Sequence, residues 1–435
     1  MNFYSTKNKS EKWSFRDAVI QGLAPDGGLF MPERIDPFPK EYFDALRQKS
    51  FSELSFDIAK QLLGDALPSD VLKGIVDRTV SFDAPVVKLE PAVWAMELYH
   101  GPTLAFKDFG ARFLAGLMGH FAESQGREIV VLVATSGDTG SAVANGFLNV
   151  PGVRVIILYP SGKVSPLQEK QLTTLGGNIT AWEVQGTFDD CQRMVKQLFM
   201  DADLRKKYLL TSANSINLAR LIPQSFYYFH GWGQLSGFNK PVVVSVPSGN
   251  FGNLTAGILA RRLGLPVSRF IASTNVNDVV PAYLASKVFN PQPSKQTISN
   301  AMDVGDPSNF ARLMDLYENV HASVKKDIIG YSFTDDQTRD IMRTVFRNHS
   351  YMLDPHGAVG YLGLKKYLSE SGSDANGLFL ETAHPGKFSE VVEETLEMKL
   401  QLPLALESLK SKKKDSLLMS NKVEDAKTAL AGIMK

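Results

Sequence analysis

The residue with the most distinctive chemical setting is a lysine near the start of an expected helix. Lys107 has apolar neighbours at Leu104, Ala105, Phe106 and Phe109, and an ammonium group in the first turn of a helix is disfavoured by the helix dipole. The structural interpretation is a lysine whose aliphatic stem lies along an amphipathic helix while its amine reaches solvent. A chemical role for Lys107 therefore depends on what other parts of the chain bring to it.

A glycine-containing loop is the first candidate partner of this lysine. In PVVVSVPSGNFGNLTAGILARRLGL, the apolar run Val242–Val246 predicts a strand, and the spacing of Leu254, Ile258 and Leu259 predicts a helix. Loop N–H groups at a helix N-terminus favour a phosphate. The loop lacks GxGxxG spacing and a Gly-Lys-Ser/Thr ending, which argues against NAD and ATP and leaves an ordinary βα turn as the alternative. The candidate phosphate site comprises Ser248, Gly249, Asn250, Phe251, Gly252 and Asn253.

A second unit of strand, glycine loop and helix begins at Ile129–Ala134 and continues as TSGDTGSAVANGFL. Ser136, Thr139 and Ser141 supply hydroxyl groups in this loop, and its N–H groups point along the following helix. Such an arrangement is suited to a carboxylate.

A third polar cluster lies at an expected junction between a loop and a helix. Asn214, Ser215, Asn217 and Arg220 are close together in the sequence. An arginine in this position can simply cap or pair on the surface. Amides and hydroxyls beside a guanidinium are also a typical anion-binding set, which makes this cluster a candidate for a second anion.

Strands alternate with helices along most of the chain, which predicts an α/β protein with parallel sheets covered on both faces. The carboxyl ends of such strands are where sites form, and the glycine loops fall there. We expect a long helix at Phe188–Lys207, with Cys191 as a core residue, and helical patterns from Phe310 to Val345. The lysine-rich tail beyond Leu406 is expected to be a solvated terminal helix.

Composition restricts the class of function. The chain has 435 residues with 47 basic and 46 acidic side chains, so no charge excess favours nucleic acid or a membrane surface. A single cysteine excludes an internal disulfide, and the seven histidines show no metal-binding spacing, so no metal is expected. The first residues, MNFYSTKNKSEKWSF, contain no apolar core of signal-peptide length, and no later stretch is apolar for long enough to cross a bilayer. We expect a cytoplasmic protein.

Eight blocks, in this order, resemble the threonine synthase family, whose members are pyridoxal-phosphate enzymes of the tryptophan-synthase-β fold group (fold type II). They are QGLAPDGGLFMPE, GPTLAFKDFGARF, ATSGDTGSA, SANSINLARLIPQ, VPSGNFGN, AMDVGDPSNFARL, DPHGAVG and ETAHPGKF. The blocks span Gln21 to about Leu400. The resemblance implies two parallel-sheet α/β domains and a threonine-synthase-type N-terminal segment. The implied division is residues 1–90 for that segment, 91–235 for a smaller domain and 236–435 for a larger one.

The resemblance also implies site roles. Lys107 would be the Schiff-base lysine and the proton shuttle, residues 248–253 would bind the cofactor phosphate, Asp138 would contact the ring oxygen, and Thr382 would face the pyridine nitrogen. The implied substrate-binding residues are Ser136, Thr139, Ser141, Asn214, Ser215, Arg220 and Lys387. Two departures stand out, because relatives in this fold group commonly have Asn at position 138 and the family often has STRG where this chain has STKNK.

The implied reaction converts O-phospho-L-homoserine and water to L-threonine and inorganic phosphate, the last step of threonine biosynthesis. Elimination at the γ-carbon would precede addition of water at the β-carbon, which makes the enzyme a carbon–oxygen lyase acting on phosphates. A serine or threonine dehydratase, a cysteine synthase and a non-catalytic cofactor-binding homologue are the alternatives. The clustered Arg220 argues against the dehydratase and cysteine synthase, since those substrates carry no phosphate. We expect a monomer or a homodimer.

Overall fold

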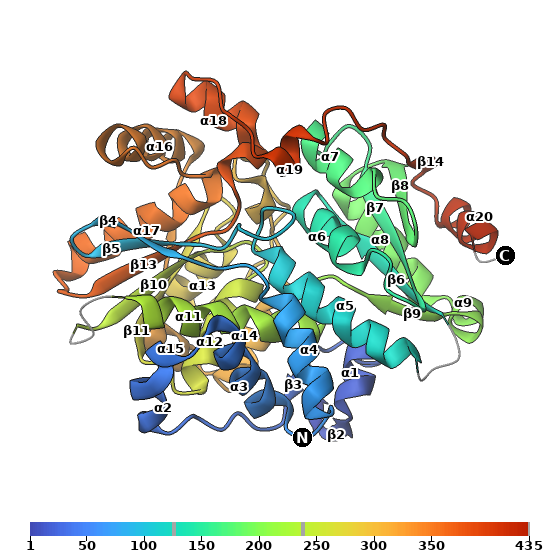
Figure 1. Ribbon diagram of the computed structural model, residues 1–435, viewed down its shortest axis with the longest axis horizontal. Coiled ribbons are helices and arrows are strands. Elements are labelled where there is room, and N and C mark those ends of the chain that lie inside the picture. Colours follow the sequence, from blue (N-terminus) through green and yellow to red (C-terminus); the bar gives the residue numbers. More distant parts are fainter. Residues whose placement is uncertain (124–127, 236–239, 434–435) are drawn as a thin grey trace.

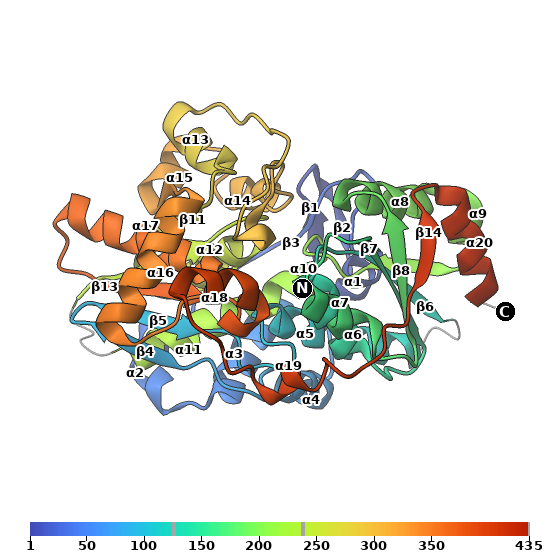
Figure 2. The same cartoon turned by 90° about the horizontal axis from the view of Figure 1, so that it is seen from above.

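The computed structural model describes residues 1–123, 128–235 and 240–433. Two α/β units lie side by side, and the N-terminal segment packs beneath both of them (Figures 1 and 2). The larger sheet has the order β12 (Ile328–Ser332), β11 (Val267–Thr274), β10 (Val242–Pro247), β13 (Asn376–Glu381), β5 (Val93–Glu97) and β4 (Val86–Glu90). The smaller sheet has the order β14 (Leu417–Ser420), β8 (Ile179–Gln185), β7 (Val153–Pro160), β6 (Ile129–Ala134) and β9 (Leu209–Ser212).

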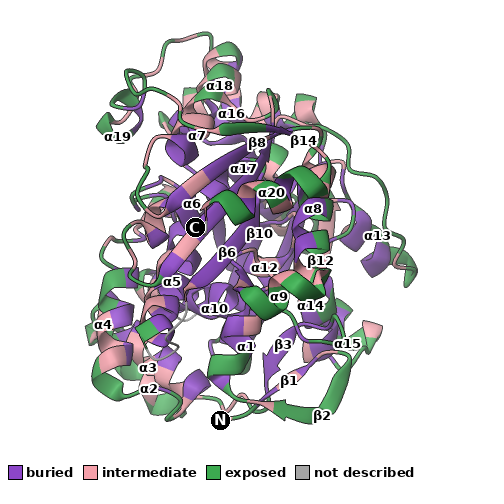
Figure 3. Cartoon of the chain, turned by 90° about the vertical axis from the view of Figure 1, so that its right-hand side faces the viewer, coloured by how far each residue is buried: buried purple, intermediate pink, exposed green. Residues whose placement is uncertain are grey.

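Nearly all of the strand pairs in these two sheets are parallel. The exception is β4, which pairs antiparallel with β5 at the edge of the larger sheet. Every residue of β6, β10 and β13 is buried, and Figure 3 shows β6 and β10 in the buried colour among the helices. The predicted parallel sheets with two covered faces are therefore confirmed, with one antiparallel edge strand added.

The N-terminal segment contributes a small antiparallel sheet as well as helices. Its strand order is β2 (Asn8–Trp13), β1 (Phe3–Ser5) and β3 (Phe30–Pro32). The helices up to the end of the smaller unit are α1 (Phe15–Gln21), α2 (Lys40–Ala45), α3 (Phe51–Leu63), α4 (Ser69–Thr79), α5 (Lys107–Glu123), α6 (Asp138–Phe147), α7 (Pro166–Thr173), α8 (Phe188–Met200), α9 (Ala202–Lys207), α10 (Leu218–Leu221) and α11 (Phe226–Gln234). The later helices are α12 (Gly252–Arg262), α13 (Val279–Ser286), α14 (Phe310–Leu316), α15 (His321–Asp327), α16 (Asp335–His349), α17 (Pro355–Ser371), α18 (Ser389–Leu396), α19 (Leu404–Glu407) and α20 (Val423–Ile433). Short 3₁₀ turns are η1 (Leu46–Gln48), η2 (Ile222–Ser225), η3 (Asn300–Met302) and η4 (Pro385–Phe388).

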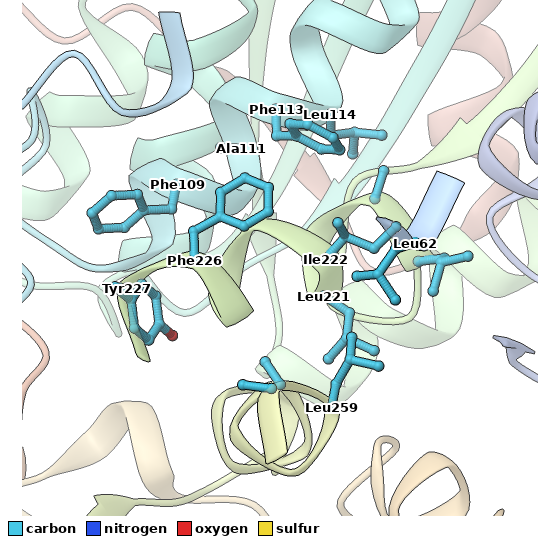
Figure 4. Packing of buried hydrophobic residues seen from close by; sticks show 14 of the residues in the cluster. Leu62, Phe109, Ala111, Phe113, Leu114, Leu221, Ile222, Phe226, Tyr227 and Leu259 are labelled. Atoms are coloured by element: carbon cyan, nitrogen blue, oxygen red, sulfur yellow. The ribbon is translucent and has the colours of Figure 1, made fainter. Parts of the chain in front are cut away.

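Helix α5 is held rigidly between the two units. Its apolar face carries Phe109, Phe113 and Leu114, which are fully buried, and Figure 4 shows them against Phe226 and Tyr227 of α11. The ring pairs Phe109–Tyr227 and Phe113–Phe226 have centroids 5.3 and 5.9 Å apart, edge-on geometries that add to burial. The first residue of this helix, Lys107, is thereby fixed in position.

Three expected elements were wrong in detail. The helix expected at Phe188–Lys207 ends at Met200, because the Asp201 carboxylate accepts hydrogen bonds from the N–H groups of Asp203 and Leu204 and starts α9. The helical pattern of residues 310–345 contains strand β12. The tail beyond Leu406 is not a single solvated helix, since β14 pairs with β8 and the side chains of Met419, Ala426 and Leu430 are buried.

The expected domain boundaries remain a prediction, but the sheets cross them in two places. Strand β5 lies within the expected smaller domain, yet it pairs with β13 in the larger sheet. Strand β14 lies within the expected larger domain, yet it extends the smaller sheet beside β8. The C-terminal segment therefore returns to the smaller unit, as Figure 2 shows.

Within the described ranges, no helix combines the length and the hydropathy needed to cross a membrane. The same residues include no cluster of three or more histidine, cysteine, aspartate or glutamate side chains arranged to hold a metal ion. Cys191 is buried in the smaller unit, as expected.

Candidate active site

A cavity of about 1690 Å³ lies between the two α/β units, at the carboxyl ends of their strands. The sequence-predicted residues that line it are Lys107, Ser136, Asp138, Thr139, Asn214, Ser215, Arg220, Thr382 and the loop 248–253. These residues follow strands β6, β9, β10 and β13 or begin α5. The topology therefore gathers side chains that are up to 275 positions apart in the sequence, from Lys107 to Thr382.

The backbone before Lys107 is bonded to the backbone around Thr382. The Phe106 N–H donates to the Thr382 carbonyl at 2.9 Å, and the His384 N–H donates to the Leu104 carbonyl at 3.0 Å. Leu104 has a φ of 59°, a left-handed conformation that turns the chain into α5. These bonds place the two residues at which the cofactor ring was predicted to bind on the same wall of the cavity.

The amine of Lys107 faces one carboxylate across the cavity wall. Its Nζ lies 3.9 Å from Oδ2 of Asp138, and its side chain is 17% exposed. Burial lowers the pKa of Lys107, with further lowering by the positive charges of Lys387 and Arg220, while Asp138 opposes the shift. A larger neutral fraction of the amine favours its action as a nucleophile and a base.

Asp138 is the most tightly held acid of the site. Its Oδ1 lies 2.6 Å from Nζ of Lys387 and accepts a hydrogen bond from Gln168 Nε2 at 2.8 Å. Burial opposes ionisation, but the nearby charges of Lys387 and Lys107 prevail and lower the pKa of Asp138 below its usual range. Asp138 is therefore a carboxylate at neutral pH.

The loop 248–253 joins strand β10 to helix α12 in a conformation suited to an anion. Phe251, the residue before α12, has a φ of 60° and a ψ of 11°, and no side chain caps the first turn of this helix. The free N–H groups of that turn are available to a ligand. The positive φ of the loop lies on Phe251 and on neither of its glycines.

Gly249 and Gly252 differ in how much space surrounds them. A Cβ on Gly249 would lie 2.6 Å from the Met302 Cα, so the backbone of η3 passes directly over the loop. A Cβ on Gly252 would meet nothing closer than 3.4 Å, an ordinary contact with Asn309. Close packing therefore requires glycine only at position 249.

Arg220 is buried beside the cavity, where the nearby charge of Asp108 favours its charged form but no carboxylate of the described residues lies within ion-pair distance. It is 3% exposed, and its Nη1 donates to the Ala213 carbonyl at 2.5 Å. The described residues provide no hydrogen-bond partner for its Nε and no ion-pair partner. Burial lowers the pKa of Arg220 to about 10, which still leaves it charged at neutral pH. A buried cation with an unused N–H group calls for an anion from outside the chain.

Ser215 connects this cluster to the phosphate loop. Its Oγ accepts hydrogen bonds from Asn250 Nδ2 at 2.6 Å and from Asn309 Nδ2 at 3.3 Å. Because both bonds use the oxygen as acceptor, its hydroxyl hydrogen remains available to a ligand. Asn214 uses its amide differently, since its Nδ2 donates to the Ala134 carbonyl at 2.9 Å and ties the cluster to the end of β6.

Two predicted site residues do not line the cavity, and a third uses part of its side chain to bind the protein. Ser141 is fully buried in α6, where its hydroxyl donates to the Gly137 carbonyl at 3.1 Å. Lys387 is also fully buried at its side chain and lies behind Asp138. Asn253 lines the cavity, but its Oδ1 accepts from Tyr227 and Tyr228 at 2.7 Å. Its Nδ2 has no hydrogen-bond partner among the described residues.

Sequence reasoning missed residues whose role is to hold the site. Arg312 is fully buried and donates to the carbonyls of Phe30, Ser215 and Ile216 and to Asn309 Oδ1. Asp108 accepts from the N–H and hydroxyl of Thr103 at 2.9 and 2.6 Å, next to Lys107. A charged residue within the matched blocks SNFARL and AFKDF was the available signal, although neither block indicates burial.

The residues present fit pyridoxal phosphate. Lys107 offers an amine of lowered pKa, the turn at Phe251 offers uncapped N–H groups for a phosphate, and Thr382 offers a neutral hydroxyl on the wall that carries Lys107. Asp138 offers a carboxylate near Lys107. The cavity is large enough for this cofactor together with a small substrate.

This fold and this lysine-centred cavity define a pyridoxal-phosphate-dependent enzyme of fold type II, and the profile described as "Pyridoxal-phosphate dependent enzyme" matches residues 79–382. The profiles "Threonine synthase N terminus" and "Threonine synthase, C-terminal" match residues 2–80 and 357–430. The chain belongs to the threonine synthase family. It is a lyase of that family, and its cofactor is pyridoxal phosphate.

Individual relatives agree with this assignment. The chain is 46% identical to the threonine synthase of Escherichia coli (strain K12) over 407 residues, covering 93% of this chain and 94% of that one. The crystal structure of threonine synthase from Escherichia coli superposes with a TM-score of 0.93 and 42% identity, covering 99% of this chain and 100% of that chain. The structure of PLP-bound threonine synthase from Brucella melitensis gives a TM-score of 0.92 and 32% identity, with 99% of both chains covered.

Proposed function

We propose that the substrate is O-phospho-L-homoserine, which the enzyme converts with water to L-threonine and inorganic phosphate. The observation that carries this proposal is the buried Arg220, which lines the cavity and whose guanidinium, among the described residues, has one hydrogen bond, to the Ala213 carbonyl, and no ion-pair partner. The loop 248–253 is a separate anion site at the start of α12. One anion site serves the phosphate of the cofactor, and the second serves a phosphate on the substrate, which a dehydratase substrate lacks.

The side chains divide the work as follows. When bound, pyridoxal phosphate supplies the electron sink that acidifies the substrate's C–H bonds. Lys107, with its lowered pKa, holds the cofactor and moves protons at the substrate's carbon atoms. Arg220 binds the leaving phosphate and stabilises its charge, with the Ser215 hydroxyl as a second donor.

The other predicted contacts orient the substrate and the cofactor ring. The loop that starts α6, with Ser136 and Thr139 at the cavity, binds the substrate carboxylate. Thr382 is a neutral partner for the ring nitrogen, which does not enforce protonation of the ring and so disfavours transamination. Ser141 and Lys387 are left out of this scheme of substrate binding, because both side chains are buried away from the cavity.

Replacement of Lys107 tests the proposed role of its amine. Borohydride treatment of the coloured wild-type protein is expected to fix the cofactor on the peptide that contains Lys107. Lys107→Ala is expected to abolish release of phosphate and threonine from O-phospho-L-homoserine, because no other amine replaces it. Lys365→Ala, which removes an amine bonded to Glu90 at a distant surface pocket, is the matched control and should keep full activity. Full threonine production by Lys107→Ala would overturn the assignment.

A further inference from the structure

Lys387 is the buried cation that the proposed reaction leaves without a task. Its side chain is fully buried, and its Nζ contacts Oδ1 of Asp138 at 2.6 Å and donates to the Thr103 carbonyl at 2.9 Å. Gln171 Nε2 also donates to the Thr103 carbonyl, at 3.3 Å. An ammonium group removed from water this completely is stable only with an ionised partner.

The partner of Lys387 is the carboxylate that faces Lys107. Because Lys387 and Gln168 both bind Oδ1 of Asp138, its Oδ2 is directed to Lys107 Nζ, 3.9 Å away. The three charges thus form a row, with one carboxylate between two amines. The amine of Lys387 is buried and fixed in place, whereas the amine of Lys107 faces the cavity.

Both lysines are anchored to the same turn of the chain. The Thr103 carbonyl holds Lys387, while the Thr103 N–H and hydroxyl bind Asp108, the residue after Lys107. A change at Lys387 is therefore transmitted to Lys107 through a charge and through a shared turn. The other charged or titratable groups near this row are Arg220, Asp108, His356 and His384.

We propose that Lys387 is a positioning residue that holds Oδ1 of Asp138 and so leaves Oδ2 directed at Lys107, and that the Asp138–Lys387 pair sets the charge of the Lys107 amine. This inference rests on the proposed role of Lys107 and replaces the predicted role of Lys387 as a substrate-binding residue. Removal of Lys387 takes away a cation and favours the charged amine of Lys107. Removal of the Asp138 charge has the opposite effect, and the two changes together compensate each other.

Competitive labelling with acetic anhydride tests these expected changes in the charge of Lys107, in cofactor-free protein. The pH midpoint of Lys107 acetylation, followed by mass spectrometry of its peptide, is expected to rise by about one pH unit or more in Lys387→Met and to fall by about as much in Asp138→Asn. The double variant is expected to return close to the wild-type midpoint. The pH midpoint of the visible absorbance of the loaded enzyme should move in the same directions.

The control is Lys414→Met, which removes a lysine that contacts Glu169 and Glu183 at 2.6 Å, away from the cavity. It should lower the melting temperature and leave the Lys107 midpoint unchanged. If Lys387→Met does not fold, Lys387→Gln, which retains an N–H donor for Thr103, takes its place, and Asp138→Asn tests the row independently. A Lys387 variant that loses stability while its Lys107 midpoint stays at the wild-type value would overturn the proposal. So would a variant whose only change is weaker inhibition by inorganic phosphate. Because labelling needs neither cofactor nor substrate, its outcome is independent of whether O-phospho-L-homoserine is the substrate.

Discussion

Arg220 and Arg312 are both buried arginines in one region of the chain, but they differ in how many of their five N–H groups are bonded to protein oxygens. Arg312 makes four hydrogen bonds to protein oxygens, whereas Nε of Arg220 has no partner among the described residues. An arginine with nearly all of its donors bonded to the protein holds structure, and one that lines a cavity with most of its donors unused can bind a ligand. This comparison assigns the phosphate to Arg220.

We expect Arg220→Ala to lower kcat/KM for O-phospho-L-homoserine by about thirtyfold to a thousandfold, because a charge-assisted contact to a desolvated phosphate is worth on the order of 2 to 4 kcal/mol. Steady-state kinetics measure the loss, and the visible spectrum of the bound cofactor should be unchanged. Arg220→Lys should recover only part of the loss, since an ammonium cannot reproduce a two-pronged grip. Release of the cofactor by Arg220→Ala would mean that the guanidinium serves the cofactor instead.

Gly110 of α5 packs against the side chain of Arg220. A Cβ at this position would lie 2.7 Å from Nε of Arg220 and 3.0 Å from its carbonyl oxygen. The small size of Gly110 therefore fixes where the arginine lies, a feature that the sequence block GPTLAFKDFGARF does not reveal.

At the residue scale, sequence could predict side chains whose type is itself unusual for their setting. Lys107 and Arg220 are such cases, and both line the cavity. Ser141 could not be placed correctly, because only the phase of α6 decides that its hydroxyl bonds to Gly137. The direction of Lys387 depends on Asp138, 249 positions earlier in the chain, and no local pattern carries that information.

In the phosphate loop 248–253, the two glycines differ in how well they should tolerate an added side chain. Gly249→Ala must push against the backbone of Met302, whereas Gly252→Ala has room for its methyl group. We expect Gly249→Ala to weaken pyridoxal-phosphate binding by about tenfold or more, equivalent to ~1.4 kcal/mol, and Gly252→Ala to weaken it much less. Titration of the cofactor-free protein measures both. Equal affinities in the two variants would show that contact with η3 does not shape the loop.

Elements with strong local signals were predicted well, while those set by contacts were not. Strands β6 and β10 are continuous apolar runs and have the expected positions. Strand β12 was missed because its burial is mostly intermediate and it lies at the edge of the sheet, where its pairing with β11 defines it. The break at Asp201 depends on one side-chain cap inside a continuous helical periodicity.

At the scale of the whole molecule, the C-terminal segment joins the two units. After α19, the chain passes to the edge of the smaller sheet, where Lys414 binds Glu169 and Glu183 and β14 pairs with β8. Helix α20 then packs on α8, and its residues Ala426 and Leu430 share an apolar cluster with Cys191. Sequence reasoning treated this tail as solvated because its lysines dominate its composition.

We expect deletion of residues 413–435 to expose this cluster and to lower the melting temperature by several degrees, because buried apolar surface is lost. Burial raises the pKa of the Cys191 thiol to about 12 in the intact chain, so its reaction with a thiol reagent should be slow. The shortened chain should react faster. Lys414→Met, which removes only the ion pairs, should keep Cys191 protected. Equal thiol reactivity of the shortened and intact chains would show that the tail does not cover α8.

Turnover of O-phospho-L-homoserine in H₂¹⁸O tests the central claim most directly, since it reports which bonds break and which carbon receives water. Elimination of phosphate followed by addition of water predicts threonine that carries ¹⁸O in its hydroxyl group, with an equal amount of phosphate that carries none. Mass spectrometry of both products gives the answer. Phosphate labelled with ¹⁸O beside homoserine, or a keto acid in place of threonine, would contradict the account.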